Sequence, residues 1–189
     1  MALFFCLTIS CSNPTPSSHS SSVINQENSL QDNKNKITQK ITPSLWVEKD
    51  ANAVAKYYLS IFKDGKLKDY HRFDKDESGS DSGLEMAVIE IAGMEFSILA
   101  AGPLFKYNES VSFVINTKDQ PETDYFWEAL TANGGEEGSC GWCKDKYGLS
   151  WQVVPIEYYG LINNDDPKIR QKALRNTLTQ KKLILSQLK

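Results

Sequence analysis

The stretch that decides the fold is residues 134–155, which read GGEEGSCGWCKDKYGLSWQVVP. The pattern predicts a β-hairpin with a strand over 140–144, a turn over 145–148 and a second strand over 149–154. The same stretch contains a Cys-x-x-Cys, Cys140-Gly141-Trp142-Cys143, a spacing found in redox proteins. A hairpin is a feature of the fold, whereas the cysteine pair suggests thiol chemistry.

Strand geometry argues against a redox role for Cys140 and Cys143. A redox Cys-x-x-Cys works when its leading thiol lies at a helix N-terminus, which lowers the thiol pKa. In an extended strand residues i and i+3 lie about 10 Å apart, beyond the roughly 7 Å between Cα atoms that a disulfide allows. A bulge at Gly141 would shorten this distance, so a bridge stays open, but two packed or half-exposed thiols are favoured. No second ligand pair follows, so the pair also makes a poor zinc site.

The composition indicates one globular domain. The chain has 189 residues, of which 40% are apolar and 24% charged, and its net charge is -3. Such mild acidity predicts no nucleic-acid partner, since nucleic-acid-binding proteins usually carry a basic stripe. Four cysteines are too few for a disulfide framework in a chain of this length.

The first residues resemble the end of a bacterial lipoprotein signal. Residues 1–10 form a short apolar run, MALFFCLTIS, and Cys11 follows as the expected site of lipid attachment. The run departs from the pattern because Thr8 stands where leucine is favoured and no Lys or Arg precedes it. This resemblance implies a protein anchored by lipid to the cell envelope, on the periplasmic side or the cell surface. The alternative is a disordered or strand-like N-terminus and a cytoplasmic protein. Residues 12–36 are polar and predict a flexible tether.

Two similar successions of elements follow. The first predicts a strand over 41–47, a helix capped by Asp50, and strands over 67–73, 85–91 and 95–100. The second predicts a strand over 110–116, a helix that Pro121 opens and Gly134 closes, and then the hairpin. Duplicated modules over about 41–102 and 108–156 predict an α+β domain spanning 37–160. Residues 161–189 predict a helical extension with Asp166 as cap. Its basic residues are expected to form a solvated face, and a membrane or partner patch is the alternative.

Several of these segments together identify a family. The strand ITPSLWV, the Phe126-Trp127 helix, the hairpin and the DDPKIRQKAL segment resemble the PhnB-like branch of the vicinal-oxygen-chelate superfamily, which includes glyoxalases, bleomycin-resistance proteins and dioxygenases. The resemblance covers about residues 38–185. It implies two tandem βαβββ modules forming curved mixed sheets, a ligand cavity between them, and a homodimer.

Some members of this branch carry a 3-demethylubiquinone methyltransferase label. The glycines at 134, 135, 138 and 141 lead from a helix into a strand, whereas a phosphate-binding loop leads from a strand into a helix. The sequence therefore does not predict a nucleotide or S-adenosylmethionine site, and methyl transfer is not expected.

The superfamily's enzymes hold a divalent metal with four side chains, typically His, Glu or Gln. Carried over by position, these places are Thr42, about Ile98, Ser110 and Gln152. Only Gln152 is a reasonable ligand, and a divalent ion needs several anionic or imidazole ligands. We therefore expect no metal and no cofactor.

The expected ligand cavity follows from strand parity, because alternate residues of a strand share a face. The predicted lining is Thr42, Ser44, Trp46, Ser110, Ser112, Ser150 and Gln152. Hydroxyls, one amide and one aromatic wall suit a neutral or partly apolar ligand; a core position is the alternative for Trp46. The sequence thus predicts a metal-free small-molecule-binding protein, with no catalytic residues assigned. The alternatives are a metal-dependent glyoxalase or dioxygenase-type enzyme and a non-catalytic envelope interaction protein.

Overall fold

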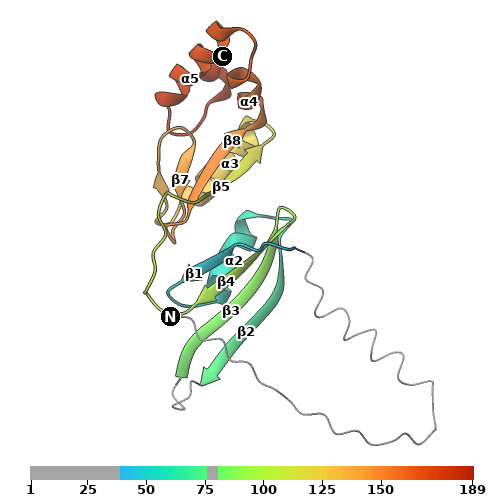
Figure 1. Ribbon diagram of the computed structural model, residues 1–189, viewed down its shortest axis with the longest axis vertical. Coiled ribbons are helices and arrows are strands. Elements are labelled where there is room, and N and C mark those ends of the chain that lie inside the picture. The colour runs from blue at the N-terminus through green and yellow to red at the C-terminus, as the bar shows by residue number, and fades with distance from the viewer. Residues whose placement is uncertain (1–38, 76–80) are drawn as a thin grey trace, which may run out of the picture. The chain divides into compact units, whose positions relative to one another are not determined.

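The computed structural model describes residues 39–75 and 81–189, and residues 41–189 form one compact unit (Figure 1). The predicted signal, the lipid-attachment residue Cys11 and the tether over 12–36 lie outside the described residues. No helix among the residues that are described is both long and apolar enough to cross a membrane.

The first module contains one helix and a four-stranded sheet. Its elements are β1 (Ser44–Val47), α2 (Ala51–Ile61), β2 (Lys66–Lys75), β3 (Asp81–Ile91) and β4 (Met94–Ala100). The strand order is β1-β4-β3-β2, with β1 parallel to β4 and the other pairs antiparallel. Asp50 caps α2 as predicted, because its carboxylate accepts the amide of Ala53 at 2.9 Å.

The second module repeats this plan. It contains β5 (Ser112–Thr117), α3 (Gln120–Thr131), β6 (Glu136–Glu137), β7 (Trp142–Lys144) and β8 (Ser150–Pro155). The strand order is β5-β8-β7-β6, and β5 runs parallel to β8 as β1 runs parallel to β4. The predicted α+β architecture of two tandem βαβββ modules is therefore confirmed.

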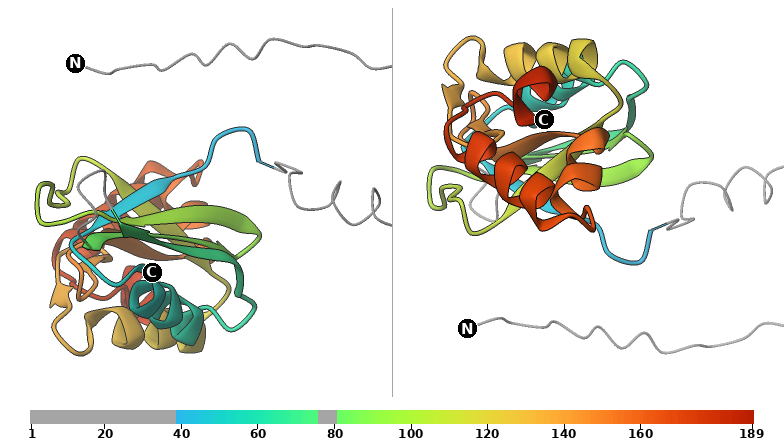
Figure 2. Two further views of the ribbon diagram at one scale, coloured as in Figure 1. Left: turned by 90° about the horizontal axis from the view of Figure 1, so that it is seen from below. Right: turned by 90° about the horizontal axis from the view of Figure 1, so that it is seen from above.

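One core joins the two modules. Helices α2 and α3 lie on the same side of the sheets (Figure 2), and the strand residues that face them are buried. Aromatic rings make the contacts between modules: Phe96 meets Phe113 at 5.0 Å between ring centroids, and Phe62 meets Phe126 at 5.3 Å. Burial of aromatic surface of this kind is a main source of stability for a domain.

The hairpin begins later than the sequence predicted. Strand β7 starts at Trp142, because Cys140 with φ of 59° and Gly141 with φ of 84° form a left-handed turn in place of extended strand. Both thiols are free, with Cys140 half-buried and Cys143 buried. Burial, with a smaller effect of Asp145, raises the pKa of the Cys143 thiol to about 12. A protonated, buried thiol is a poor nucleophile, so the structure agrees with packed cysteines.

The C-terminal extension folds back onto the second module. It comprises α4 (Ile156–Ile162), α5 (Pro167–Leu178) and α6 (Leu185–Leu188), and Asp166 caps α5 as predicted. The buried side chains of Leu183 and Leu188 pack with Val154 of β8.

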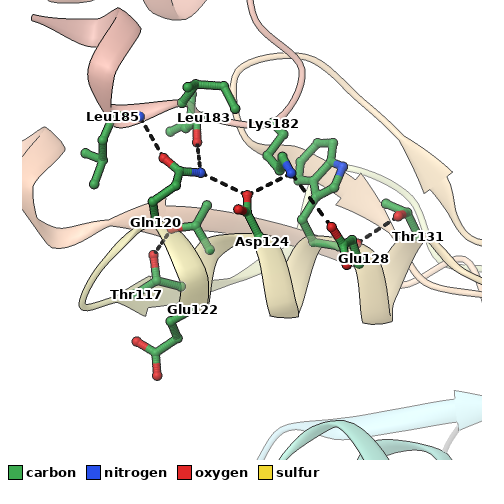
Figure 3. A network of polar contacts seen from close by, with 12 residues as sticks. Thr117, Gln120, Glu122, Asp124, Glu128, Thr131, Lys182, Leu183 and Leu185 are labelled. Carbon is green, nitrogen blue, oxygen red and sulfur yellow. Dashed lines mark hydrogen bonds and ion pairs between the residues drawn. The ribbon is translucent and has the colours of Figure 1, made fainter.

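Polar contacts fasten the extension to α3 (Figure 3). The side chain of Gln120 donates to the carbonyl of Leu183 at 3.1 Å and accepts the amide of Leu185 at 2.8 Å. Lys182 forms an ion pair with Asp124 at 2.7 Å. In addition, the amides of Cys140 and Gly141 donate to the carbonyls of Gln180 and Lys181, so the left-handed turn serves as a docking point for the extension.

Candidate ligand-binding site

A buried carboxylate, Asp145, connects the hairpin turn to the first module. It is 1% exposed and accepts four hydrogen bonds. The Tyr58 hydroxyl and the Trp151 indole each donate at 2.9 Å, and the amides of Tyr147 and Leu149 donate at 2.8 and 3.2 Å. A buried charge is costly unless it is hydrogen-bonded in this way. Since Tyr58 belongs to α2, the cluster holds the two modules together.

The electrostatics of this cluster follow from burial. Desolvation raises the pKa of Asp145 above its usual value, and its hydrogen bonds only partly oppose this shift. Burial and the neighbouring Asp145 also raise the pKa of Tyr57, Tyr58 and Tyr107, so these phenols stay protonated at neutral pH. The hydroxyls of Tyr57 and Tyr107 are buried and have no partner within the described part of the chain. The cluster therefore offers no activated phenolate or thiolate.

Two of the predicted cavity residues meet directly. Gln152 of β8 donates from Nε2 to the Ser112 hydroxyl of β5 at 2.9 Å. Ser44 and Trp46 lie on one face of β1, where Trp46 is held by its indole bond to the Gly102 carbonyl at 2.8 Å. Phe105 meets the Trp46 ring edge-on at 4.9 Å between centroids. Ser44 and Trp46 thus share a face of the first sheet, whereas Ser112 and Gln152 meet on the second.

The other predicted residues are dispersed. Thr42 and Ser110 are exposed and lie just before β1 and β5, and Ser110 bonds to Asn108 in its own loop. Ser150 is buried, and its hydroxyl finds no partner among the residues described. Ser44, Trp46, Ser112 and Ser150 line four different depressions. Thr42, Ser110 and Gln152 line none of these four depressions, so no one of the four is lined by all seven residues.

The four positions carried over from the metalloenzymes do not form a metal-binding set. Ile98 is fully buried in the core and pairs with Leu45, which is also buried, whereas Trp46 is opposite Leu99. Thr42 and Ser110 are exposed neutral hydroxyls. Within residues 39–75 and 81–189, no group of three or more His, Cys, Asp or Glu side chains could hold a metal ion. This donor set does not fit a divalent metal.

Of the four depressions, all within the described part of the chain, the one with the greatest volume is a groove of about 620 Å³ that follows β5. Among the described strands β5 pairs with β8 alone and so lies at an edge of its sheet, and side chains from both of its faces reach the groove. The apolar lining includes Phe96 of β4, Phe113 of β5 and Trp151 of β8. Ser112, Asn116, Asp64 and Glu122 supply the polar groups. Sequence parity missed Phe113 because it assigned only one face of this strand to the ligand.

One further contact relates the groove to the C-terminal extension. The Tyr159 hydroxyl of α4 bonds to the Asn116 side chain at 3.0 Å, and Asn116 is one of the groove's polar groups. The extension therefore touches the end of the groove at the last residues of β5.

With the geometry established, comparison with known proteins identifies the family. The family model described as 3-demethylubiquinone-9 3-methyltransferase matches residues 39–154. The chain belongs to this family. The match ends before α4, so the C-terminal extension lies outside the part that defines the 3-demethylubiquinone-9 3-methyltransferase family.

The chain is also similar to proteins of known structure. A PhnB protein from Bacillus cereus, described as a 3-demethylubiquinone-9 3-methyltransferase, is 25% identical with a TM-score of 0.55; the alignment covers 62% of this chain and 99% of that one. The Pseudomonas aeruginosa protein PA1353 has the same fold, at 17% identity and a TM-score of 0.52, over 62% of this chain and 98% of that one. The fosfomycin resistance protein FosX from Listeria monocytogenes aligns at 19% identity and a TM-score of 0.45, over 63% and 92% of the two chains. No curated protein matches the chain.

Proposed function

We propose that the protein binds a small, largely apolar molecule in the β5 groove and needs no metal ion to do so. The observation that carries this proposal is the lining of the groove, where Phe96, Phe113 and Trp151 lie beside a few polar groups. Small-molecule sites typically combine apolar walls with a small number of placed polar side chains. Asp64 and Glu122 are the charged groups of the lining, so the groove favours a neutral or cationic ligand over an anion.

The paired side chains Ser112 and Gln152 support an orienting role. The Gln152 side-chain amide donates a hydrogen bond to the oxygen of the Ser112 hydroxyl. The Ser112 hydroxyl proton therefore remains available to donate to an acceptor on the ligand. Since Ser112 lines the groove, a ligand carbonyl or ether oxygen is the expected partner. The absence of a suitable donor set among the described residues supports binding without a metal.

The test is saturable binding of N-phenyl-1-naphthylamine, a neutral apolar dye, measured by fluorescence with and without EDTA. Val114 is 45% exposed and lines the groove, so Val114→Trp should fill it and weaken dye binding by about tenfold or more. Val111→Trp is the matched control, because Val111 is 63% exposed and lies outside this groove.

Binding that survives EDTA and is lost only in Val114→Trp supports the proposal. Equal binding by both variants would place the ligand elsewhere. Loss of binding in EDTA would favour the metal-dependent glyoxalase or dioxygenase-type alternative. No saturable binding of any compound in a broad ligand screen would favour a non-catalytic envelope interaction protein.

We also propose export and lipid anchoring through Cys11. The support is the apolar run of residues 1–10 followed by a cysteine. Incorporation of labelled palmitate that disappears in Cys11→Ser, with the protein in the membrane fraction, is the expected result. A cytoplasmic, unlabelled protein would contradict it. A homodimer is a further proposal, tested by the molar mass from light scattering.

A further inference from the structure

Helix α5 presents a face that combines cations with large apolar side chains. At about 100° per residue, this face lies opposite the buried residues Ala173 and Thr177. We call it the α5 outer face, and it consists of Lys168, Lys172, Leu174, Arg175 and Leu178.

The α5 outer face is uncovered in the structure. Leu174 is 48% exposed and Leu178 is 74% exposed. Lys168, Lys172 and Arg175 are exposed too, and none of them forms an ion pair with a residue in the described ranges. In the right-hand view of Figure 2, α5 lies at the front with no other element over it.

The two signs of charge are unevenly distributed along the chain, and the basic residues are concentrated at its C-terminal end. Residues 156–189 contain seven Lys or Arg and three Asp or Glu, which gives this extension a net charge of +4. The whole chain carries -3, so the remainder carries -7. An anionic surface attracts the basic extension and repels the acidic remainder of the protein. The protein should therefore approach such a surface with the extension facing it.

From these observations we infer that the α5 outer face docks on an anionic membrane surface. Cations attract anionic lipid headgroups, and the two leucines enter the boundary between headgroups and acyl chains. The phosphates of a nucleic acid would attract the cations, but they would provide no apolar surface for Leu174 and Leu178 to contact. The basic residues of the extension thus have a role beyond the solvated face expected from sequence.

Docking by this face does not depend on a lipid anchor. One basic cluster supplies weak, reversible membrane binding, and a lipid chain would add a second signal. The inference is therefore tested on the full chain carrying Cys11→Ser, which removes the proposed acylation site and leaves α5 unchanged.

The experiment is co-sedimentation with vesicles of phosphatidylcholine alone or mixed with phosphatidylglycerol, at about 0.1 M salt. We expect binding only to the anionic vesicles, weakened by added salt. The triple variant Lys168→Gln, Lys172→Gln, Arg175→Gln should reduce partitioning by about a hundredfold. The matched control lowers the net charge equally by changing three exposed lysines outside α5, which form no ion pair with any described residue. These changes are Lys49→Gln, Lys56→Gln and Lys118→Gln.

A second variant separates lipid from other anions. Leu174→Ser with Leu178→Ser keeps every charge and should weaken vesicle binding by about tenfold. The inference is overturned if the α5 triple variant and the control triple variant lose binding equally, or if the wild-type chain does not bind anionic vesicles. It is also overturned if duplex DNA binds with the same dependence on the cations while the leucine variant behaves as wild type. Self-association that the leucine variant abolishes, without vesicle binding, would assign the face to a second copy of the chain.

Discussion

Removing one hydroxyl, in Tyr58→Phe, tests whether the Asp145 cluster holds the modules together. The change keeps the buried ring and removes the bond of 2.9 Å from the Tyr58 hydroxyl to the Asp145 carboxylate. A hydrogen bond to a charged group contributes about 1.5–3 kcal/mol, and here the carboxylate stays buried with one donor fewer. We expect the free energy of unfolding to fall by about 2 kcal/mol, which lowers Tm by about 4–8 °C for a domain of this size.

The neighbouring residue Tyr57 provides a matched control. Its hydroxyl is buried and is not among the donors to the Asp145 carboxylate in the described structure, so Tyr57→Phe removes the same atom and leaves all four bonds to Asp145 in place. Urea denaturation followed by tryptophan fluorescence should show a lower midpoint for Tyr58→Phe, with Tyr57→Phe unchanged or slightly stabilised. Equal losses in the two variants, or a loss below about 0.5 kcal/mol in Tyr58→Phe, would refute the reasoning.

The remaining predictions concern pH, the extension and the thiols. Burial raises the pKa of Asp145 above 3.8 in the folded state, so the folded protein binds a proton at this carboxylate more readily than the unfolded chain does. The free energy of unfolding should therefore fall as pH rises from about 4 through the folded pKa. Asp145→Asn cannot ionise and should flatten this slope of unfolding free energy against pH; an unchanged slope would exclude Asp145 as its source. Leu183→Ala should lower the free energy of unfolding by about 2–5 kcal/mol because the side chain is fully buried. Leu178→Ala, at an exposed position, should change it by nearly zero when both are measured by thermal melting. Equal effects would mean that the extension is not packed as described. Burial raises the pKa of Cys143 to about 12, so this thiol should resist iodoacetamide at pH 8 in the native state and react on unfolding. Mass spectrometry distinguishes its labelling from that of Cys140, and fast labelling of native Cys143 would contradict its burial.

Local signals in the sequence located the helices and longer strands of the two modules, whereas α4 was not predicted as a separate helix. Asp50 and Asp166 were identified as helix caps because a carboxylate before an apolar helical pattern satisfies free amides. The start of the hairpin was placed two residues early, since the left-handed turn at Cys140 and Gly141 depends on bonds to Gln180 and Lys181, far along the chain. No local pattern reports such a contact.

The binding site was less predictable because it depends on register and on neighbouring modules. Carrying the second metal position to about Ile98 selects the core face, and the neighbour Leu99 is the residue opposite Trp46. A shift of one residue in a strand moves a side chain to the other face of the sheet. The groove along β5 also needs the placement of β4, which provides Phe96 from the other module.

The bond between Tyr58 and Asp145 has a consequence for how two copies of the chain could associate. The modules meet through noncovalent contacts and are connected by residues 101–111, so α2 of one copy could dock on the hairpin of another with the same bonds. A closed monomer and a dimer with exchanged modules would then differ only in the path of that connection. Shortening residues 101–111 would favour exchange, because a short connection no longer lets a module fold back onto its own partner.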